Sequence, residues 1–180
     1  MNQAELKPHA LLQEFVDILL QEAPHGSVLD LASGNCHNGI FLAQQGFNVI
    51  CCDISAAALN SVSDAAGSLG VKVKTLQIDL ERQDSNPLPP EQFAVILVFR
   101  YLHRPLLPHL REALQHTGFL IYETYTVDQV KFGRPHNPDF LLKPKELLEA
   151  FTGWKIIHYF EGILSNPDRA VAQLVCRKPG

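Results

Sequence analysis

Three aspartates stand where a carboxylate could bind a ligand. Asp30, Asp53 and Asp79 each lie at or near the end of a short apolar run. In an open parallel sheet the carboxyl ends of the strands share one edge, and ligands bind there where the strand order switches. Any one of these acids could instead cap the helix that follows it. Three in register favour a common binding crevice.

A loop of small and polar residues follows the first of these acids. Its residues are Ala32, Ser33, Gly34, Asn35, Cys36, His37, Asn38 and Gly39. Such a loop lets the backbone approach a ligand closely, and an acid at the end of the next strand, here Asp53, accepts hydrogen bonds from ribose hydroxyls. An ordinary strand–loop–helix crossover uses similar residues. Together with the acids, the loop predicts a site for a nucleotide-derived cofactor.

The spacing of the loop distinguishes two kinds of cofactor. A dinucleotide site has glycines in the pattern G-x-G-x-x-G, which place a pyrophosphate on the helix amides, whereas Gly34 and Gly39 are five residues apart. A pyrophosphate beside Asp30 would also meet a repulsion on the order of a few kcal/mol. A cationic ligand would be attracted, and S-adenosylmethionine carries a sulfonium and an ammonium but no phosphate. The loop therefore favours S-adenosylmethionine and disfavours a nicotinamide-dependent reductase.

The elements that must position these residues alternate between strand and helix. Apolar residues at intervals of three and four predict a helix over 11–20, and prolines make 86–90 a loop. The other predicted elements are strands over 27–31, 47–52, 71–78, 93–99 and 119–124, and helices over 38–45, from Ser55 to Gly67 or Gly70, and over 105–114. This order predicts an α/β fold, a Rossmann-like sheet of seven mostly parallel strands with helices on both faces.

The C-terminal part breaks this alternation. The runs 154–160 and 170–177 are separated by too few residues for a crossover helix, so we expect a C-terminal antiparallel hairpin that completes the sheet. No repeat or linker interrupts the chain, so residues 1–180 are expected to form one domain with an N-terminal helical segment at 1–26. The connection at 125–143 is long, which favours a substrate-side loop. A solvated insertion without function is the alternative.

Composition narrows the class of protein. The chain has 180 residues, 46% of them hydrophobic and 19% charged, with a formal net charge of -4. These values are typical of a globular protein and make nucleic acid an improbable partner, since such proteins cluster Lys and Arg. The apolar runs are shorter than the roughly 20 residues that span a membrane, and residues 1–7 do not resemble a signal peptide. We therefore expect a cytoplasmic protein without a membrane partner.

The cysteines carry no recognisable pattern. Cys36, Cys51, Cys52 and Cys176 show neither the spacing of a zinc site nor that of a disulfide framework. We expect reduced thiols and no bound metal. The oligomeric state leaves no signal in the sequence.

The segment from Leu29 to Ser55 resembles the first two motifs of class I S-adenosylmethionine-dependent methyltransferases. The closest likeness is to small bacterial enzymes related to the tellurite-resistance methyltransferase. The resemblance extends along nearly the whole chain: 78–80 is similar to the adenine-contacting motif, 93–103 to the fourth strand and its exit, and 118–124 to the fifth strand. The terminal antiparallel pair is similar to that family's sixth and seventh strands.

The resemblance implies a role for each matched residue. Asp30 would bond to the ammonium of the cofactor through backbone or water, and Asp53 would accept both ribose hydroxyls. The loop residues that would hold the methionine part are Ala32, Ser33, Gly34, Asn35, Cys36 and Asn38. Ile54 would flank the adenine, Asp79 would accept from its exocyclic amine and Leu80 would supply an amide to a ring nitrogen. Phe99 and Arg100 would border the methionine part near the methyl group.

Two loop positions depart from the family pattern. Glycine is usual where Ala32 and Cys36 stand, because a β-carbon there crowds the backbone against the ligand. Ala32 is a mild change. We expect Cys36 to weaken cofactor binding or to shift the pose of the cofactor.

The acceptor side offers fewer signals. Methyl transfer is an in-line displacement, so an enzyme mainly aligns the nucleophile and accepts its proton. Candidate catalytic residues are Arg100, Tyr101 and His103, with residues 123–126 as further neighbours; His103 could equally be a surface residue at a helix start. Lys131 and Arg134 would favour an anionic substrate if their side chains point inward.

These observations predict methyl transfer from S-adenosylmethionine to a small-molecule acceptor. A catalytically weak or inactive S-adenosylmethionine-binding protein, with a regulatory or interaction role, is the alternative. The acceptor itself is left open, because such folds host many substrates.

Overall fold

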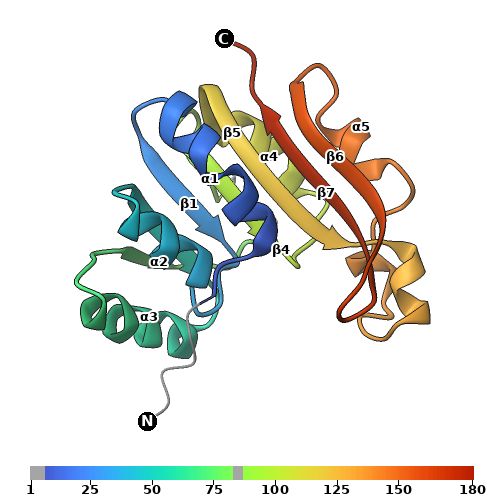
Figure 1. Ribbon diagram of the computed structural model, residues 1–180, viewed down its shortest axis with the longest axis horizontal. Coiled ribbons are helices and arrows are strands. Elements are labelled where there is room, and N and C mark those ends of the chain that lie inside the picture. Colours follow the sequence, from blue (N-terminus) through green and yellow to red (C-terminus); the bar gives the residue numbers. More distant parts are fainter. Residues whose placement is uncertain (1–6, 83–86) are drawn as a thin grey trace.

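A seven-stranded sheet forms the centre of the computed structural model, which describes residues 7–82 and 87–180. Its strands are β1 (Ser27–Leu31), β2 (Asn48–Asp53), β3 (Lys74–Gln77), β4 (Phe93–Phe99), β5 (Leu114–Tyr125), β6 (Lys155–Leu164) and β7 (Arg169–Arg177). They lie in the order β3-β2-β1-β4-β5-β7-β6. The first five pair in parallel, and β7 runs antiparallel to β5 and β6. The predicted α/β, Rossmann-like fold with its C-terminal hairpin is confirmed (Figure 1).

Helices cover both faces of this sheet, as predicted (Figure 1). One face packs against α1 (Ala10–Glu22), α2 (His37–Gln44) and α3 (Ala56–Ser68), and the other against α4 (Leu106–Ala113) and α5 (Glu146–Ala150). Burial from both sides explains why β4 is an unbroken apolar run, with its first six residues buried. The apolar faces of the helices thus hold the carboxyl ends of β1, β2 and β4 in fixed positions.

Among the parallel strands, β3 and β5 differ from their predicted bounds by more than one residue. The strand predicted over 71–78 is shorter, because β3 lies at the edge of the sheet and pairs only with β2 through four exposed residues. The strand predicted over 119–124 is longer, because β5 begins at Leu114. Its pairing with β4 is irregular between the partners of Phe93 and Val95. Thr117 adopts a left-handed backbone there, with φ of 62°.

Two predicted segments extend beyond the described residues. Residues 1–6 of the N-terminal segment and 83–86, which include the start of the predicted proline loop, lie outside the described part. Within that part, α1 confirms the helix predicted over 11–20, and 87–90 is neither helix nor strand. No helix among residues 7–82 and 87–180 is long and apolar enough to cross a bilayer.

The connection at 125–143 is closed at its base. The Val127 amide donates to the Leu142 carbonyl (3.0 Å) and the Leu142 amide to the Tyr125 carbonyl (2.9 Å). Two short 3-10 helices, η1 (Val127–Lys131) and η2 (Pro138–Phe140), lie within it. The segment is therefore a shaped loop that begins and ends beside the carboxyl end of β5.

Candidate cofactor and acceptor site

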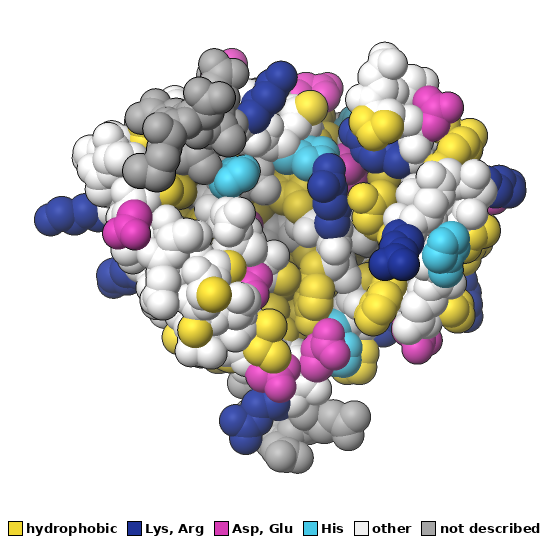
Figure 2. Space-filling model, turned by 90° about the horizontal axis from the view of Figure 1, so that it is seen from below, with side chains coloured by type: hydrophobic (Ala, Val, Ile, Leu, Met, Phe, Trp, Pro, Cys, Tyr) yellow, Lys and Arg dark blue, Asp and Glu magenta, His cyan; other side chains and the backbone are white. Residues whose placement is uncertain are grey.

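The carboxyl ends of the parallel strands form an edge that is hollowed. Figure 2 views the molecule from this side and shows hydrophobic side chains in the hollow, with acidic, basic and His side chains around it. Two cavities open here, of about 470 Å³ and about 440 Å³. Arg100, directly after β4, lines both. The first cavity is bounded by the loop after β1, and the second by the loop at 125–143.

The loop after β1 is held by the strand beside it. The Ser33 amide donates to the Cys52 carbonyl (2.9 Å), and the Gly34 amide donates to Asp53 Oδ2 (2.8 Å). Asp53 Oδ1 accepts from the Ser55 amide (2.9 Å). Each carboxylate oxygen has one backbone donor and a remaining lone pair, so Asp53 is fixed in place and can still accept from two hydroxyls.

Two further features of this loop fit a nucleoside cofactor with an amino-acid end. Ser33 Oγ is buried and has no hydrogen-bond partner among the described residues, and it lines the first cavity together with Asn35 and Phe99. A buried hydroxyl without a partner calls for one. Next to Asp53, the Ile54 side chain is 64% exposed, although it is large and apolar. A polar methionine end at Ser33 and a flat adenine over Ile54 would satisfy both.

The adenine-side residues are brought next to Asp53 by the backbone. The Ile78 amide donates to the Asp53 carbonyl (3.0 Å), which fixes the exit of β3 beside that of β2. Asp79 Oδ1 accepts from the Glu81 amide (3.0 Å). The Leu80 side chain is 6% exposed and packs in the core, so only its backbone is available to a ligand.

Asp30 is placed differently from the other two aspartates. Its side chain is 2% exposed, and Oδ2 accepts from the Gly39 amide of α2 (2.8 Å). Burial raises its pKa from 3.8 to about 7, the Gly39 hydrogen bond opposes that rise, and the charge of Asp53 adds to it. The expectation that all three acids line one crevice is thus wrong for Asp30, which the structure places beneath the loop. It can reach a ligand only through the loop backbone or water.

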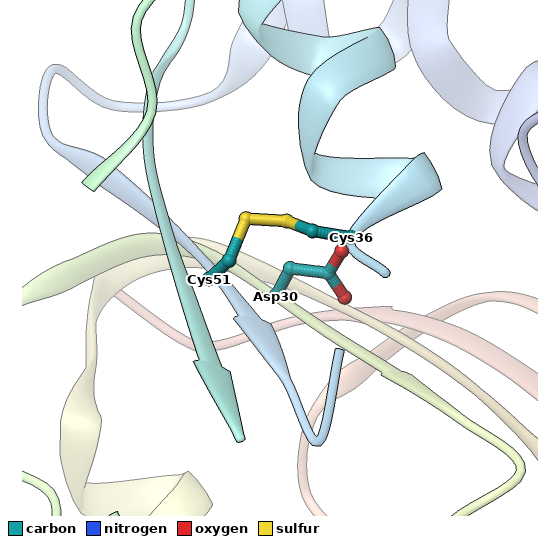
Figure 3. A group of neighbouring side chains, drawn as sticks. All are labelled: Asp30, Cys36 and Cys51. Atoms are coloured by element: carbon teal, nitrogen blue, oxygen red, sulfur yellow. A yellow bond between two sulfur atoms is a disulfide. The ribbon is translucent and has the colours of Figure 1, made fainter. Parts of the chain in front are cut away.

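The cysteine of the loop forms a disulfide. Cys36 is bonded to Cys51 of β2, with Cα atoms 6.0 Å apart, and Figure 3 shows the pair beside Asp30. The expectation of four reduced thiols is wrong for these two; Cys52 and Cys176 are free and buried. The two cysteines are 15 residues apart, a spacing without a motif, and only the pairing of β1 with β2 brings them together.

The same cluster holds three possible metal-ligand atoms. The ligand atoms of Asp30, Cys36 and Cys51 lie within 4.8 Å of one another. A disulfide leaves no thiolate for a metal, because both sulfurs are bonded to each other. The expectation of no metal stays a prediction.

Ala32 and Cys36 share a backbone conformation that explains the family's glycines. Their φ angles are 50° and 54°, in the left-handed region that glycine adopts without a steric penalty. The Cys36 side chain is fully buried, with its sulfur in the core rather than in the cavity. The predicted crowding of the ligand by this side chain is therefore wrong, and its cost lies in the backbone.

A histidine before α1 covers the methionine end of the site. The His9 ring stacks on Phe99 with centroids 4.3 Å apart, and its amide donates to Asn38 Oδ1 (2.7 Å). His9 Nδ1 accepts from the Leu11 amide (3.3 Å), so Nε2 carries the proton and donates to Glu123 Oε1 (3.0 Å). Both ring nitrogens are occupied. His9 therefore positions the N-terminal segment over the loop.

Glu123 is the buried partner of this histidine. Burial opposes its ionisation. Hydrogen bonds from His9 and from the side-chain amide of Gln173 (2.6 Å) outweigh burial and leave the pKa of Glu123 below its ordinary value. The sequence pointed to Glu123 as a neighbour of the acceptor and missed His9 and Gln173. Histidine is not among the preferred helix caps, so the sequence held no signal for His9.

The second cavity lies on the acceptor side. Tyr101 lines it, with its hydroxyl 3.5 Å from Glu81 Oε1, and its carbonyl accepts from the Tyr122 hydroxyl (3.0 Å). Burial and the nearby Glu81 raise the pKa of Tyr101 above its ordinary value. His103 lines neither cavity; its carbonyl accepts from the Leu106 amide at the start of α4. This contact fits the alternative in which His103 is a residue at the start of a helix.

Arg104 holds the C-terminal part of the loop at 125–143 over this cavity. Arg104 forms a bidentate pair with Glu146 (2.6 and 2.9 Å) and donates to the carbonyls of Asp139 (2.9 Å) and Leu141 (2.8 Å). The hydrogen bonds from Arg104 and the Lys143 amide outweigh the burial of Glu146 and lower its pKa. The sequence did not indicate this clamp, because Arg104 and the residues that it binds are about 40 residues apart along the chain.

The two basic residues of the loop point in different ways. Arg134 lines the second cavity. Lys131 lines neither cavity, and its ammonium pairs with Asp128 one turn earlier (2.6 Å). The condition that the side chain points inward is thus met by Arg134 and not by Lys131, whose local partner Asp128 holds it at the surface.

Comparison with known proteins decides the family. A family profile described as a methyltransferase domain matches residues 28–118, just over half of the chain. The chain belongs to the methyltransferase-domain family. Solved structures that share its fold include an S-adenosylmethionine-dependent methyltransferase and a methyltransferase in complex with S-adenosyl-L-homocysteine.

Solved structures share the fold of this methyltransferase domain. TehB from Haemophilus influenzae is 18% identical with a TM-score of 0.75, covering 92% of this chain and 62% of TehB. An S-adenosylmethionine-dependent methyltransferase from Methanosarcina mazei is 14% identical with a TM-score of 0.70, covering 90% and 97%. A Pyrococcus abyssi tRNA (uracil-54, C5)-methyltransferase in complex with S-adenosyl-L-homocysteine is 19% identical with a TM-score of 0.60, covering 91% and 37%.

A curated relative is longer than this chain. Hemagglutinin 1 from Eikenella corrodens is 28% identical over 158 residues, which are 86% of this chain and 51% of that protein. The methyltransferase domain therefore spans about half the length of this relative.

Proposed function

We propose that this domain transfers a methyl group from S-adenosylmethionine to a small molecule held in the cavity of about 440 Å³ beside Tyr101. The observation that carries the proposal is the position of Arg100, which lines this cavity and also the one bounded by Ser33. A molecule in the second cavity would lie next to the methionine end of the cofactor. In-line transfer requires this adjacency.

The residues proposed to hold the cofactor are those at the exits of three strands, β1, β2 and β3. Asp53 accepts from the ribose, Ile54 and Asp79 lie on the adenine side, and Ser33 and Asn35 bind the methionine end. When bound, S-adenosylmethionine supplies an electrophilic methyl carbon, which takes the lone pair of the acceptor while the electrons of the carbon–sulfur bond pass to sulfur. The remaining work of the protein is to align the acceptor atom with this methyl carbon.

Positioning on the acceptor side falls to groups that do not titrate near neutrality. The Tyr122 hydroxyl fixes the Tyr101 backbone, and Arg104 fixes the loop over the cavity. Both ring nitrogens of His9 are occupied, so a proton released by the acceptor is expected to leave to water. This arrangement suits an acceptor that is already a good nucleophile.

The experiment is incubation of the protein with S-adenosylmethionine and a library of small thiols, amines, phenols and acids. We expect S-adenosylhomocysteine and one methylated product to form in equal amounts, both measured by mass spectrometry. The Asp53→Ala variant should form about 100-fold less of both when S-adenosylmethionine is far below saturation. If the protein binds S-adenosylhomocysteine yet methylates no member of the library, the alternative of a cofactor-binding regulatory or interaction protein replaces this proposal.

A further inference from the structure

Five of the seven arginines of this chain fall into two groups. Arg104, Arg111 and Arg177 all donate hydrogen bonds to carbonyls of distant segments, and Arg104 and Arg177 also pair with acids. Arg100 and Arg134 make no side-chain hydrogen bond or ion pair with any residue in 7–82 or 87–180. Both line the acceptor-side cavity. The two guanidiniums there are thus available to a ligand.

Arg100 also holds a strained backbone. Its φ is 57°, in the left-handed region that is unfavourable for a non-glycine residue. The Arg100 amide donates to the Glu123 carbonyl at the end of β5 (2.8 Å), which holds this conformation. Such strain persists where the surrounding structure fixes it, and it is concentrated at binding sites.

The other residues of the cavity define its chemistry. Tyr101, Tyr125 and Phe140 supply aromatic surface, and Leu102 and Pro135 supply aliphatic surface. Phe140 is 48% exposed, so part of its ring is available to a ligand in the cavity. Glu81 is the one acid among the lining residues, and the Tyr101 hydroxyl faces it. Two guanidiniums against one carboxylate leave the cavity net positive.

From this arrangement we propose that the acceptor-side cavity binds a small organic anion, with Arg100 and Arg134 on its carboxylate and the aromatic side chains on its apolar body. This inference rests on the proposed function and names the class of acceptor. Guanidiniums pair with carboxylates through two parallel hydrogen bonds, and planar acids stack on aromatic rings. Arg100 places the anion next to the cofactor, while Arg134 determines that only an acid fills the cavity.

The test is calorimetric titration of the protein, saturated with S-adenosylhomocysteine, with benzoate and with benzamide. The two probes have the same shape and differ in charge. We expect benzoate to bind at least about ten-fold more tightly than benzamide, and Arg134→Gln to remove about ten-fold of the benzoate affinity. The affinity for S-adenosylhomocysteine should change less than about two-fold in this variant, because Arg134 does not line the first cavity.

Lys131→Gln is the matched control. It removes the same charge from the same loop, at a side chain that pairs with Asp128 and lines neither cavity, so benzoate binding should be unchanged. Equal binding of benzoate and benzamide, or no benzoate binding up to about 10 mM, overturns the inference. So does an unchanged benzoate affinity in both Arg134→Gln and Arg100→Gln. Failure of S-adenosylhomocysteine to bind would instead contradict the proposed function.

Discussion

The two halves of the site are held in different ways. On the cofactor side, backbone amides and a buried disulfide fix the loop after β1 against β2, as in the Gly34 to Asp53 hydrogen bond and the Cys36–Cys51 bond. On the acceptor side, the loop at 125–143 is held by side chains that reach other segments: Arg104, just before α4, and Gln129, which accepts from the Ala170 amide of β7 (2.9 Å). The cofactor side is thus fixed by its own strands, and the acceptor side by long-range side-chain contacts.

Because of this difference, the two loops should differ in how substitutions within them affect the protein. A change in the cofactor loop disturbs strands in the centre of the sheet, whereas a change in the acceptor loop alters a surface that its base hydrogen bonds at Tyr125 and Leu142 already close off. The cofactor side should respond to substitution with losses of stability and cofactor affinity. The acceptor side should respond with losses of acceptor binding at nearly unchanged cofactor affinity.

The largest effect is expected from removal of the disulfide. Replacing both Cys36 and Cys51 with Ala should lower the free energy of unfolding by about 3 kcal/mol, measured by urea denaturation, because the bond closes a loop of this length in the unfolded chain. Cys176→Ala removes a buried free thiol and is the control for lost packing. Thiol titration of the denatured wild-type chain should find two thiols, and a count of four would contradict the bond.

The next effect concerns the ribose acceptor. Asp53→Ala should weaken S-adenosylhomocysteine binding about 100-fold, because it removes two hydroxyl acceptors and frees the Gly34 amide. Calorimetry measures the change. Asp64→Asn, at an exposed position of α3, removes the same charge and should leave binding within about two-fold. Equal affinities in the two variants would remove Asp53 from the cofactor site.

The clamp is expected to act on the other half alone. Arg104→Ala leaves Glu146 and the Asp139 and Leu141 carbonyls without their donor, at a cost of about 2 kcal/mol. Amide hydrogen exchange over 134–146 should accelerate, while S-adenosylhomocysteine affinity stays within about two-fold. A large loss of cofactor affinity in this variant would show that the two halves are not independent.

A pH effect distinguishes Asp30 from the acids of the surface. Since burial raises its pKa to about 7, the stability that Asp30 contributes is present below about pH 4 and is lost as pH rises through 7. The ionised form attracts a cation, so S-adenosylmethionine affinity should rise about ten-fold from pH 6 to pH 8. Asp30→Asn should flatten this profile, and an equally steep profile in the variant would assign the titration to another group.

The smallest effect concerns the backbone of the loop. In a Cys51→Ala background, Cys36→Gly should raise the free energy of unfolding by about 1 kcal/mol relative to Cys36→Ala, because glycine adopts the observed φ of 54° without strain. Thermal denaturation measures the difference. Equal stabilities would show that the left-handed conformation costs nothing here.

The parts that the sequence predicts are those with local causes. Apolar runs and small-residue turns predict all seven strands and the hairpin, and the acids predict the strand exits. The disulfide, the His9–Glu123 pair and the Arg104 clamp each join residues distant in the chain, which no spacing reveals. Lys131 and Arg134 stand three residues apart on one loop and have opposite orientations, because only Lys131 has an acid one turn away.

Calorimetric titration of the wild-type protein with S-adenosylhomocysteine tests the central claim most directly, that the exits of β1, β2 and β3 form a cofactor site. The account predicts one molecule bound per chain with a dissociation constant in the micromolar range, which corresponds to a binding free energy of about −8 kcal/mol. No binding at about 1 mM, with the protein folded and its disulfide intact, would contradict it.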